Sequence, residues 1–278
     1  MSELLTFVHL TDLHVGDPAV QDDHLYSDTS ATLAAILAEV KSLVPQPKFI
    51  VASGDLTNRG DADSYAQLKR LLAEAELDMP VLFALGNHDR RDGFYPAMLE
   101  RTENTGAPYD HAQVIHGIHV IVLDSSIPNK VGGGFEPGQL DWLKSELDQH
   151  ADLPKLLVMH HAPSLDADPS MEWESLSIAD TEHLRQAVAG KNVIGILSGH
   201  IHFDRVTQIL VDQHGRVARD LDRSCDIFLK LRLTVHDFHR AATQHIGWTH
   251  EHGVTDAIGD RDRFFPAAGN AIGRLEHA

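Results

Sequence analysis

Short apolar segments of this chain repeatedly end in a cluster of aspartate, asparagine, histidine and glycine residues. At least five segments that read as β-strands end in this way. Because strand ends at one edge of an α/β sheet form the place where ligands bind, folding is expected to bring these distant clusters together. Loops that serve only solvation would instead carry a mixture of serine, lysine, glutamate and threonine. The clusters are Asp12-Leu13-His14, Ser53-Gly54-Asp55, Gly86-Asn87-His88-Asp89, His160-His161 and Gly199-His200-Ile201-His202.

Strand-like and helix-like patterns alternate through the first two thirds of the chain. The helix-like segments repeat apolar residues at spacings of three and four, whereas the strand-like segments are short, apolar and rich in β-branched residues. Such alternation predicts an α/β architecture. The expected strands cover residues 5–10, 49–52, 81–85, 118–123, 156–159 and 193–197, and the expected helices cover 33–44, 65–75, 137–147 and 180–189.

The residue types in the clusters indicate metal chemistry. Carboxylate and amide oxygens combined with imidazole nitrogens suit zinc, manganese, iron or cobalt ions. Cys225 is the one cysteine of the chain, which argues against a structural zinc site built from thiolates. There are more candidate ligands than one metal needs, and two ions that share a carboxylate would use them all. The candidates are Asp12, His14, Asp55, Asn87, His160, His200 and His202.

In their order along the chain, these clusters resemble the motifs of the calcineurin-like metallophosphoesterases. The family pattern is D-x-H, G-D, G-N-H-[DE], a later H and G-H-x-H, each after a strand, and all five blocks are intact here. Gly-Asn-His-Asp is the most specific block, while Gly-Asp alone carries little weight. The resemblance implies an α/β fold of four layers, an α/β/β/α sandwich of two mixed sheets flanked by helices.

The resemblance also implies roles for individual residues. Asp12, His14, Asp55 and His202 would hold the first metal, and Asp55, Asn87, His160 and His200 the second, with Asp55 bridging. His88 is not a ligand in the family and would act on the substrate phosphate, oriented by Asp89. The catalytic residues implied are thus His88, Asn87 and Asp55. Asp124 is expected to be either a partner of this centre or a structural cap, and His161 to serve packing or hydrogen bonding.

Finer similarity points to the cyclic-nucleotide phosphodiesterase and glycerophosphodiesterase branch, the class III phosphodiesterases. The similarity covers residues 4–208, the expected catalytic core. It rests on Ser53-Gly54-Asp55-Leu56-Thr57-Asn58-Arg59-Gly60, Leu123-Asp124-Ser125-Ser126, the glycine loop Gly132-Gly133-Gly134, and Gln139-Leu140-Asp141-Trp142-Leu143. Met159-His160-His161-Ala162-Pro163 is close to the M-H-H-P-P of the branch, with Ala162 in place of a proline.

This branch implies hydrolysis of a phosphodiester by a hydroxide that bridges two metal ions. A 3′,5′-cyclic nucleotide such as cAMP is the leading substrate. The alternatives are a glycerophosphodiester or a broad range of phosphomonoesters, and, in another class, a metal-binding scaffold without activity. The pocket that selects the substrate is expected to draw on residues 17–30, 90–110, 129–136 and 164–180.

Charge and composition limit the classes of substrate and partner that this chain is expected to bind. The chain has 41 acidic and 23 basic residues and a net charge of −18, which disfavours a nucleic acid polymer as substrate. No segment is apolar enough to span a membrane, and the N-terminal residues lack the pattern of a signal peptide. These features favour a cytoplasmic protein with a small phosphodiester substrate. The family resemblance is compatible with a homodimer.

The C-terminal segment, residues 209–278, departs from the branch. We expect it to complete the second sheet or to form a small cap, with strands at 206–211 and 227–235. It is rich in histidine, and an additional metal site there is a minor hypothesis beside exposed or partner-facing side chains. The histidines concerned are His236, His239, His245, His250 and His252.

Overall fold

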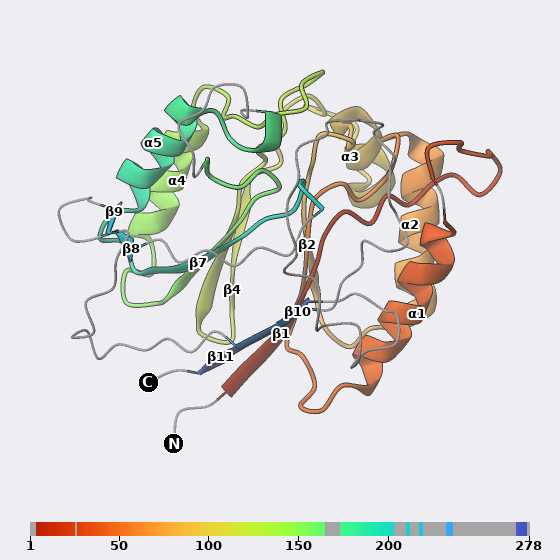
Figure 1. Ribbon diagram of the computed structural model, residues 1–278, viewed down its shortest axis with the longest axis horizontal. Coiled ribbons are helices and arrows are strands. Elements are labelled where there is room, and N and C mark those ends of the chain that lie inside the picture. Colours follow the sequence, from red (N-terminus) through yellow and green to blue (C-terminus); the bar gives the residue numbers. More distant parts are fainter. Residues whose placement is uncertain are drawn as a thin grey trace, which may run out of the picture.

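The computed structural model describes residues 4–25, 27–164 and 173–202, together with four short strands of the C-terminal segment. Two β-sheets lie side by side in the middle of the molecule, and helices flank them on both sides (Figure 1). Within the described residues, no helix is long and apolar enough to cross a membrane.

The first sheet contains the N-terminal strand and has five strands in the order β10-β11-β1-β2-β3. Its three strands from the N-terminal part of the chain run parallel, whereas β11 pairs antiparallel with β1 and β10 antiparallel with β11. The sheet is therefore mixed, as expected. The strands are β1 (Leu4–Leu10), β2 (Ile50–Ser53), β3 (Val81–Ala84), β10 (Arg232–Val235) and β11 (Ala271–Glu276).

The second sheet has four strands in the order β4-β5-β6-β7, with only the first pair antiparallel. The pattern analysis missed β4, an edge strand that is exposed in its middle. His116 and Gly117, both at positive φ, join β4 to β5, which is the conformation that two-residue hairpins need. The strands are β4 (His111–Ile115), β5 (Ile118–Val122), β6 (Lys155–Val158) and β7 (Val193–Leu197).

The two sheets pack face to face through an apolar core. Alternate residues of β1 point to opposite faces, so Phe7 lies between the sheets whereas Val8 lies under the helices. The rings of Phe7 and Phe49 are stacked with centroids 5.0 Å apart. Val120, Leu156 and other buried residues of the second sheet complete this inner core.

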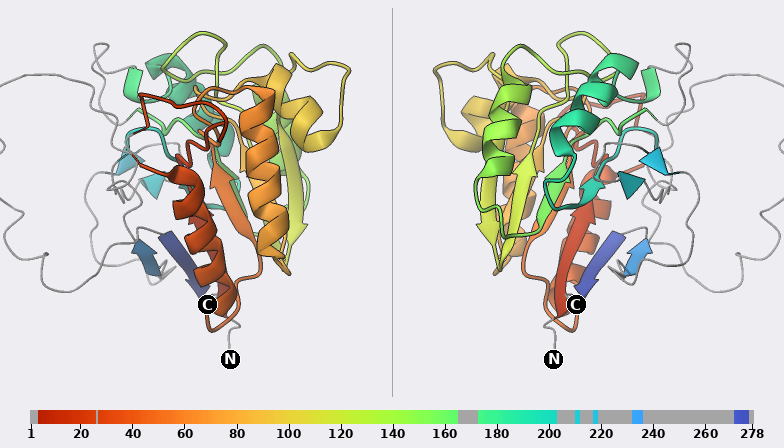
Figure 2. Two further views of the ribbon diagram at one scale, coloured as in Figure 1. Left: turned by 90° about the vertical axis from the view of Figure 1, so that its right-hand side faces the viewer. Right: turned by 90° about the vertical axis from the view of Figure 1, so that its left-hand side faces the viewer.

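Helices cover the outer face of each sheet, which confirms the four-layer sandwich (Figure 2). Asp28, Asp61 and Ser177 cap three of them by accepting hydrogen bonds from N–H groups of the first turn. Helix α3 was not expected, because Gly93 and Pro96 interrupt its apolar pattern. On the first sheet lie α1 (Thr29–Ser42), α2 (Ala62–Ala75) and α3 (Arg91–Leu99), and on the second α4 (Gln139–Asp148) and α5 (Ile178–Val188).

Only strands of the C-terminal segment are described. Of the strands expected at 206–211 and 227–235, the structure has β8 (Leu210–Val211) and β10, and it adds the short β9 (Val217–Ala218) and β11. Where described, the segment adds two strands to the sheet of β1 and forms the separate pair β8-β9. The domain boundary at residue 208 stays a prediction. The histidines from His236 to His252 lie outside the described residues.

Candidate metal centre

The five polar clusters meet at one edge of the sandwich. They follow the carboxyl ends of β1, β2, β3, β6 and β7, as the alternation predicted. Main-chain hydrogen bonds hold the loops together: Asp12 N–H donates to the Gly54 carbonyl at 3.0 Å, and Gly199 N–H donates to the His160 carbonyl at 2.9 Å. The sheets thus place side chains from distant parts of the sequence around one centre.

Asp12, His14, Asp55 and His202 form the first group of converging donor atoms, all within 4.8 Å of one another. The Nε2 atoms of His14 and His202 are 3.2 Å apart, and His202 Nε2 is 3.2 Å from Asp12 Oδ1. Asp55 Oδ2 lies 3.8 Å from His14 Nε2. These four residues are among the candidate ligands identified from the motifs, and they form the group expected to bind the first metal.

The same oxygen of Asp55 also faces a second group of donors. Asp55 Oδ2 is 3.3 Å from His160 Nε2, which is in turn 3.3 Å from Asn87 Oδ1. The His160 and His200 rings are in contact, with centroids 5.1 Å apart. Asp55 therefore lies between the two groups, and its role as a bridging ligand stays a prediction.

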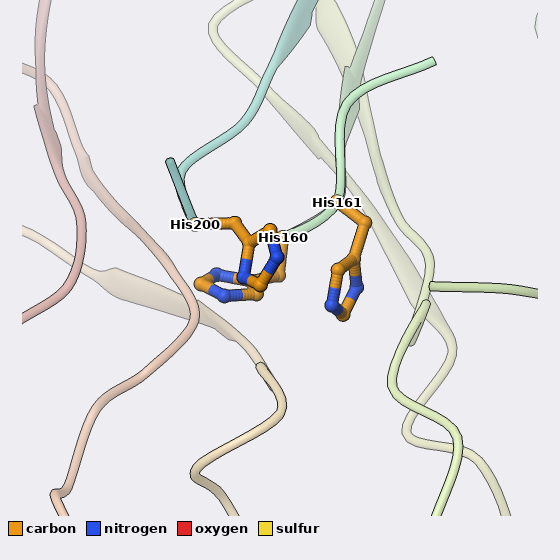
Figure 3. Close-up of side chains that lie close together, drawn as sticks. All are labelled: His160, His161 and His200. Carbon is orange, nitrogen blue, oxygen red and sulfur yellow. The ribbon is translucent and has the colours of Figure 1, made fainter. Parts of the chain in front are cut away.

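Hydrogen bonds to main-chain carbonyls fix which ring nitrogen faces the centre. His160 Nδ1 donates to the Ser53 carbonyl at 3.0 Å, so that Nε2 presents its lone pair. His200 Nε2 donates to the Trp173 carbonyl at 2.8 Å, which leaves Nδ1 as its lone-pair nitrogen. Figure 3 shows His200 reaching toward His160 from a different segment of the chain.

His161 lies beside these two rings but has a different environment. Together with His160 and His200 it forms a group whose ring nitrogens lie within 4.8 Å of one another. However, its Nε2 donates to the Val131 carbonyl and its Nδ1 pairs with the Ser125 hydroxyl, both at 2.9 Å. Because both ring nitrogens are hydrogen-bonded, the structure favours the hydrogen-bonding role for His161 over metal binding.

The backbone is strained where the donors lie. Asp12, His14, Asp55, His200 and His202 all have positive φ values, between 45° and 76°. Residues other than glycine rarely adopt this left-handed conformation, and such strain gathers at functional sites. Each strand end bends sharply at these positions, which turns the side chains toward one centre.

Two glycines are required by the close approach of the loops. A Cβ on Gly86 would lie 2.2 Å from Asp55 Oδ1, and a Cβ on Gly54 would lie 2.6 Å from His160 Nδ1. Gly54 also has a φ of 104°. Any side chain at either position would push Asp55 or His160 out of place.

The donor geometry fits two cations. Two atoms that bind one ion at about 2.1 Å lie about 3.4 Å apart in tetrahedral coordination. In octahedral coordination they lie about 3.0 Å apart when adjacent and about 4.2 Å apart when opposite. The measured separations of 3.2, 3.3 and 3.8 Å fall within this range. Oxygen and nitrogen donors without thiolates match the borderline divalent ions expected from the sequence.

The electrostatics of the centre favour positive charge. Burial raises the pKa of Asp55, but the neighbouring imidazoles, His160 above all, outweigh burial and hold the pKa well below its usual range. Burial lowers the pKa of His160, but Asp55 outweighs this and raises it to about 9. Burial lowers the pKa of His14 to about 4. A cation bound at Asp55 would take the place of the proton on His160.

The family model of the calcineurin-like phosphoesterases matches residues 5–204, which include every one of these donors. The chain belongs to this family. This calcineurin-like phosphoesterase is 35% identical over 202 residues to a probable cyclic nucleotide phosphodiesterase of Rhodococcus erythropolis, a match that covers 70% of this chain and 64% of that protein.

A second relative has a more specific name. The chain is 31% identical over 204 residues to a cAMP/cGMP dual specificity phosphodiesterase of Mycobacterium tuberculosis, covering 70% of this chain and 61% of that protein. The matches therefore span less than two thirds of the length of either relative. The names of these relatives agree with the cyclic-nucleotide phosphodiesterase and glycerophosphodiesterase branch expected from the motifs.

A solved structure of low sequence identity shares the fold. The purple acid phosphatase from yellow lupin seeds superposes with a TM-score of 0.52 at 14% identity, over 73% of this chain and 38% of the phosphatase. This likeness supports the four-layer architecture of this calcineurin-like phosphoesterase.

His88 lies beside the first group of donors, and its ring meets that of His14 edge-on at 4.8 Å. The expectation that Asp89 orients His88 is wrong. His88 Nδ1 donates to the Asn58 carbonyl at 2.9 Å, whereas the Asp89 carboxylate accepts from the N–H groups of Leu56, Thr57 and Gly86 and from the Tyr65 hydroxyl. Asp89 therefore holds the loops after β2 and β3 together.

Asp124 is part of a buried structural network, the second of the two roles considered. Its Oδ2 accepts from Arg91 Nε at 2.8 Å and its Oδ1 from Ser126 N–H at 3.0 Å. Arg91 also pairs with Glu136 at 2.6 Å. The sequence analysis did not identify Arg91 as part of this network. Its partners are 33 and 45 residues away along the chain, and no local pattern predicts such distant contacts.

A shallow cavity of about 170 Å³ opens at the corner formed by the loop after β1 and the turn after β2. Of the segments expected to form the substrate pocket, only residues 17–30 contribute to it. The cavity is lined by Asp17, Val20, Asp22, Arg59, Asp61 and Asp63. The location of the substrate pocket stays a prediction.

Proposed function

We propose that this protein is a metal-dependent phosphodiesterase that hydrolyses small phosphodiesters, with 3′,5′-cyclic nucleotides as its leading substrates. One observation carries the proposal: a single carboxylate oxygen, Asp55 Oδ2, lies 3.8 Å from His14 Nε2 in one group of donor atoms and 3.3 Å from His160 Nε2 in the other. Paired ions sharing one carboxylate are a common arrangement for phosphoester hydrolysis.

The ligand assignment follows the two groups. Asp12, His14 and His202 would hold one ion, and Asn87, His160 and His200 the other, with Asp55 shared. Manganese, iron, zinc or cobalt suit these donors. Such ions supply Lewis-acid activation of water and neutralise the charge of the phosphate when bound. The chain's own contribution is to hold the donors rigidly, at strand ends that are already strained into place.

In this proposal, His88 is the residue that exchanges protons with the substrate. Its Nδ1 is held by the Asn58 carbonyl, so protons are gained and lost at Nε2. Hydrolysis adds water across one P–O ester bond, and the leaving alcohol needs a proton. His88 Nε2 would supply that proton as a general acid, and opening of the cyclic phosphate leaves a nucleoside monophosphate.

The substrate class draws support from the relatives and from charge. Both relatives described above are named as cyclic nucleotide phosphodiesterases. The net charge of −18 disfavours nucleic acid polymers, whereas a small ester that carries one charge meets far less repulsion. A cytoplasmic setting and a homodimer remain predictions within this proposal.

The test compares a diester with a monoester. The protein is stripped with a chelator, reloaded with Mn²⁺, and assayed on bis(p-nitrophenyl) phosphate and p-nitrophenyl phosphate. Strong metal-dependent cleavage of the diester, followed by cleavage of cAMP in preference to glycerophosphocholine, is the expected result. Preference for glycerophosphocholine would move the substrate to glycerophosphodiesters, and preference for the monoester would indicate a phosphatase. No turnover with metal bound would indicate a scaffold.

A further inference from the structure

The orientation of His88 depends on a residue that has no other role in the centre. A carbonyl oxygen can only accept, so the 2.9 Å contact with Asn58 requires the proton on His88 Nδ1. None of the described residues hydrogen bonds to His88 Nε2, which leaves it open for proton exchange with a substrate. The placement of the Asn58 main chain therefore sets both the tautomer and the direction of the His88 ring.

Two of its contacts help to hold Asn58 in place. Its N–H donates to the Val15 carbonyl at 3.1 Å, which ties it to the loop after β1. Its side-chain Nδ2 donates to Asp22 Oδ2 at 2.7 Å. One side of Asn58 is thus fixed by the backbone and the other by a carboxylate that lies 36 residues earlier in the sequence.

The Asp22 side chain is buried and accepts several hydrogen bonds. Its side chain is only 6% exposed, although it lies in a surface loop. Besides Asn58, its Oδ2 accepts from Arg59 Nε at 2.7 Å, and its Oδ1 accepts from His24 N–H at 3.1 Å. Three donors from two loops converge on one carboxylate, which limits the movement of each.

We propose that Asp22 is a positioning residue for His88, acting through the Asn58 side chain and the Asn58 carbonyl. This inference rests on the proposed function, because it assigns a purpose to the orientation of His88. Without the Asp22 carboxylate, the Asn58 side chain loses its 2.7 Å hydrogen bond, and the turn is held less firmly. The His88 ring then samples other orientations, in which Nε2 no longer faces the ester oxygen.

A purely structural role would look different. If Asp22 only fastened the surface loop through Arg59, its loss would lower thermal stability and leave the His88 ring unchanged. If it positions His88, its loss would lower kcat more than it changes KM, and the effect would vanish once His88 is gone. The two readings therefore differ in measurable ways.

The experiment uses the metal-loaded full chain with five variants. Asp22→Ala removes the carboxylate, and Asp22→Asn keeps an oxygen that accepts from Asn58 Nδ2. Asp23→Asn is the matched control, since Asp23 is exposed and only accepts a long 3.4 Å contact from Gln21. His88→Ala and its combination with Asp22→Ala complete a double-mutant cycle. Metal content and thermal melting are recorded for every variant.

We expect Asp22→Ala to lower kcat on bis(p-nitrophenyl) phosphate by about 10- to 100-fold, a loss typical of a misplaced catalytic group. Asp22→Asn should recover most of this loss, and Asp23→Asn should equal the wild type. In the His88→Ala background, Asp22→Ala should change kcat by less than about 2-fold, because its target is already absent. An equal loss in both backgrounds, or no loss in either, would overturn the proposal.

A second readout is independent of turnover. In the zinc-loaded protein with ¹⁵N-labelled histidine, the His88 nitrogens, assigned from the His88→Ala spectrum, should report protonation at Nδ1. Asp22→Ala should shift this signal toward a mixture of tautomers, whereas Asp23→Asn should not. A wild-type His88 spectrum in Asp22→Ala contradicts the positioning role even if activity falls. Because no substrate is present, this outcome stays distinct from failure of the proposed phosphodiesterase activity.

Discussion

Asp55 Oδ2 lies 3.3 Å from His160 Nε2. The two residues are 105 positions apart in sequence and follow strands of different sheets, β2 and β6. Their contact therefore exists only because the sheets pack face to face with their carboxyl ends at one edge. The same oxygen is 3.8 Å from His14 Nε2, so this one carboxylate connects the two groups of donors.

Replacing Asp55 should weaken metal binding at the centre. Asp55→Asn keeps the size of the side chain but removes its charge, so we expect loss of at least one metal ion per chain and of nearly all diester hydrolysis. Metal content by mass spectrometry and turnover on bis(p-nitrophenyl) phosphate check this. Asp78→Asn, at an exposed position between α2 and β3, is the control and should keep both. Two bound ions with near-normal turnover would refute the bridging assignment.

Replacing His88 should separate catalysis from metal binding. His88 contacts the first group only through the His14 ring, and its Nδ1 is taken by Asn58. We expect His88→Ala to keep the metal content and to lower kcat by about 10²- to 10⁴-fold, the usual contribution of a general acid. Metal content and steady-state kinetics, measured on the same preparation, test this prediction. Loss of metal in this variant would place His88 among the ligands.

A single methyl group at Gly86 should disrupt the centre. The Cβ of Gly86→Ala would lie 2.2 Å from Asp55 Oδ1 and 2.5 Å from Asp55 N, and backbone atoms cannot move aside easily. We expect weaker metal binding, seen by titration with Mn²⁺ or Zn²⁺, and a lower melting temperature. Gly106→Ala is the matched control, because nothing lies within 4 Å of its Cβ. Equal metal affinity of the two variants would show that the loop adapts.

Most strands and helices between residues 5 and 197 could be predicted because their apolar periodicity is strong. The exceptions have physical reasons. In α3, Gly93 and Pro96 break the pattern, and in β4 the exposed middle of an edge strand removes the buried run that marks an inner strand. The pairing of β11 with β1 joins the two ends of the sequence, which no local pattern reveals.

The candidate metal ligands could be selected from the sequence for a different reason. Their residue types are chemically specific, and each follows an apolar strand, so the sequence alone places them at one edge. The residues that orient these side chains have no distinctive residue type. Asn58 and Trp173 act through main-chain carbonyls, which every residue has. Asp89 was assigned to His88 because the two are adjacent in sequence, but its carboxylate turns toward backbone N–H groups instead.

The buried ion pair of Arg91 should be essential for stability. Arg91 is 7% exposed and lies 2.8 Å from Asp124, so Arg91→Met leaves a buried carboxylate without its cationic partner. We expect a loss of about 3–5 kcal/mol in the free energy of unfolding, measured by urea denaturation. Arg90→Met is the control, since Arg90 pairs with Asp92 at the surface, where such pairs contribute about 1 kcal/mol or less. Similar losses in both variants would contradict this reading.

The stability of the protein at acidic pH should depend on His111. Burial lowers the pKa of His111 in β4 to about 4, from its ordinary value of 6.5. Its Nδ1 is buried, has no hydrogen-bond partner among the described residues, and its ring lies 4.5 Å from that of Tyr109. Above pH 6.5 the ring is neutral in both the folded and the unfolded protein. Between pH 6.5 and 4 only the unfolded chain takes up the proton, so stability is lost as the pH falls through this window.

His111→Phe should remove this loss while keeping the ring packed on Tyr109. We expect the wild type to lose up to about 2 kcal/mol more stability than His111→Phe between pH 7.5 and pH 5, measured by urea denaturation at both values. His24→Gln, in an exposed loop, serves as the control and should follow the wild type. Parallel losses in wild type and His111→Phe would mean that this imidazole is protonated in the folded protein as readily as in the unfolded chain.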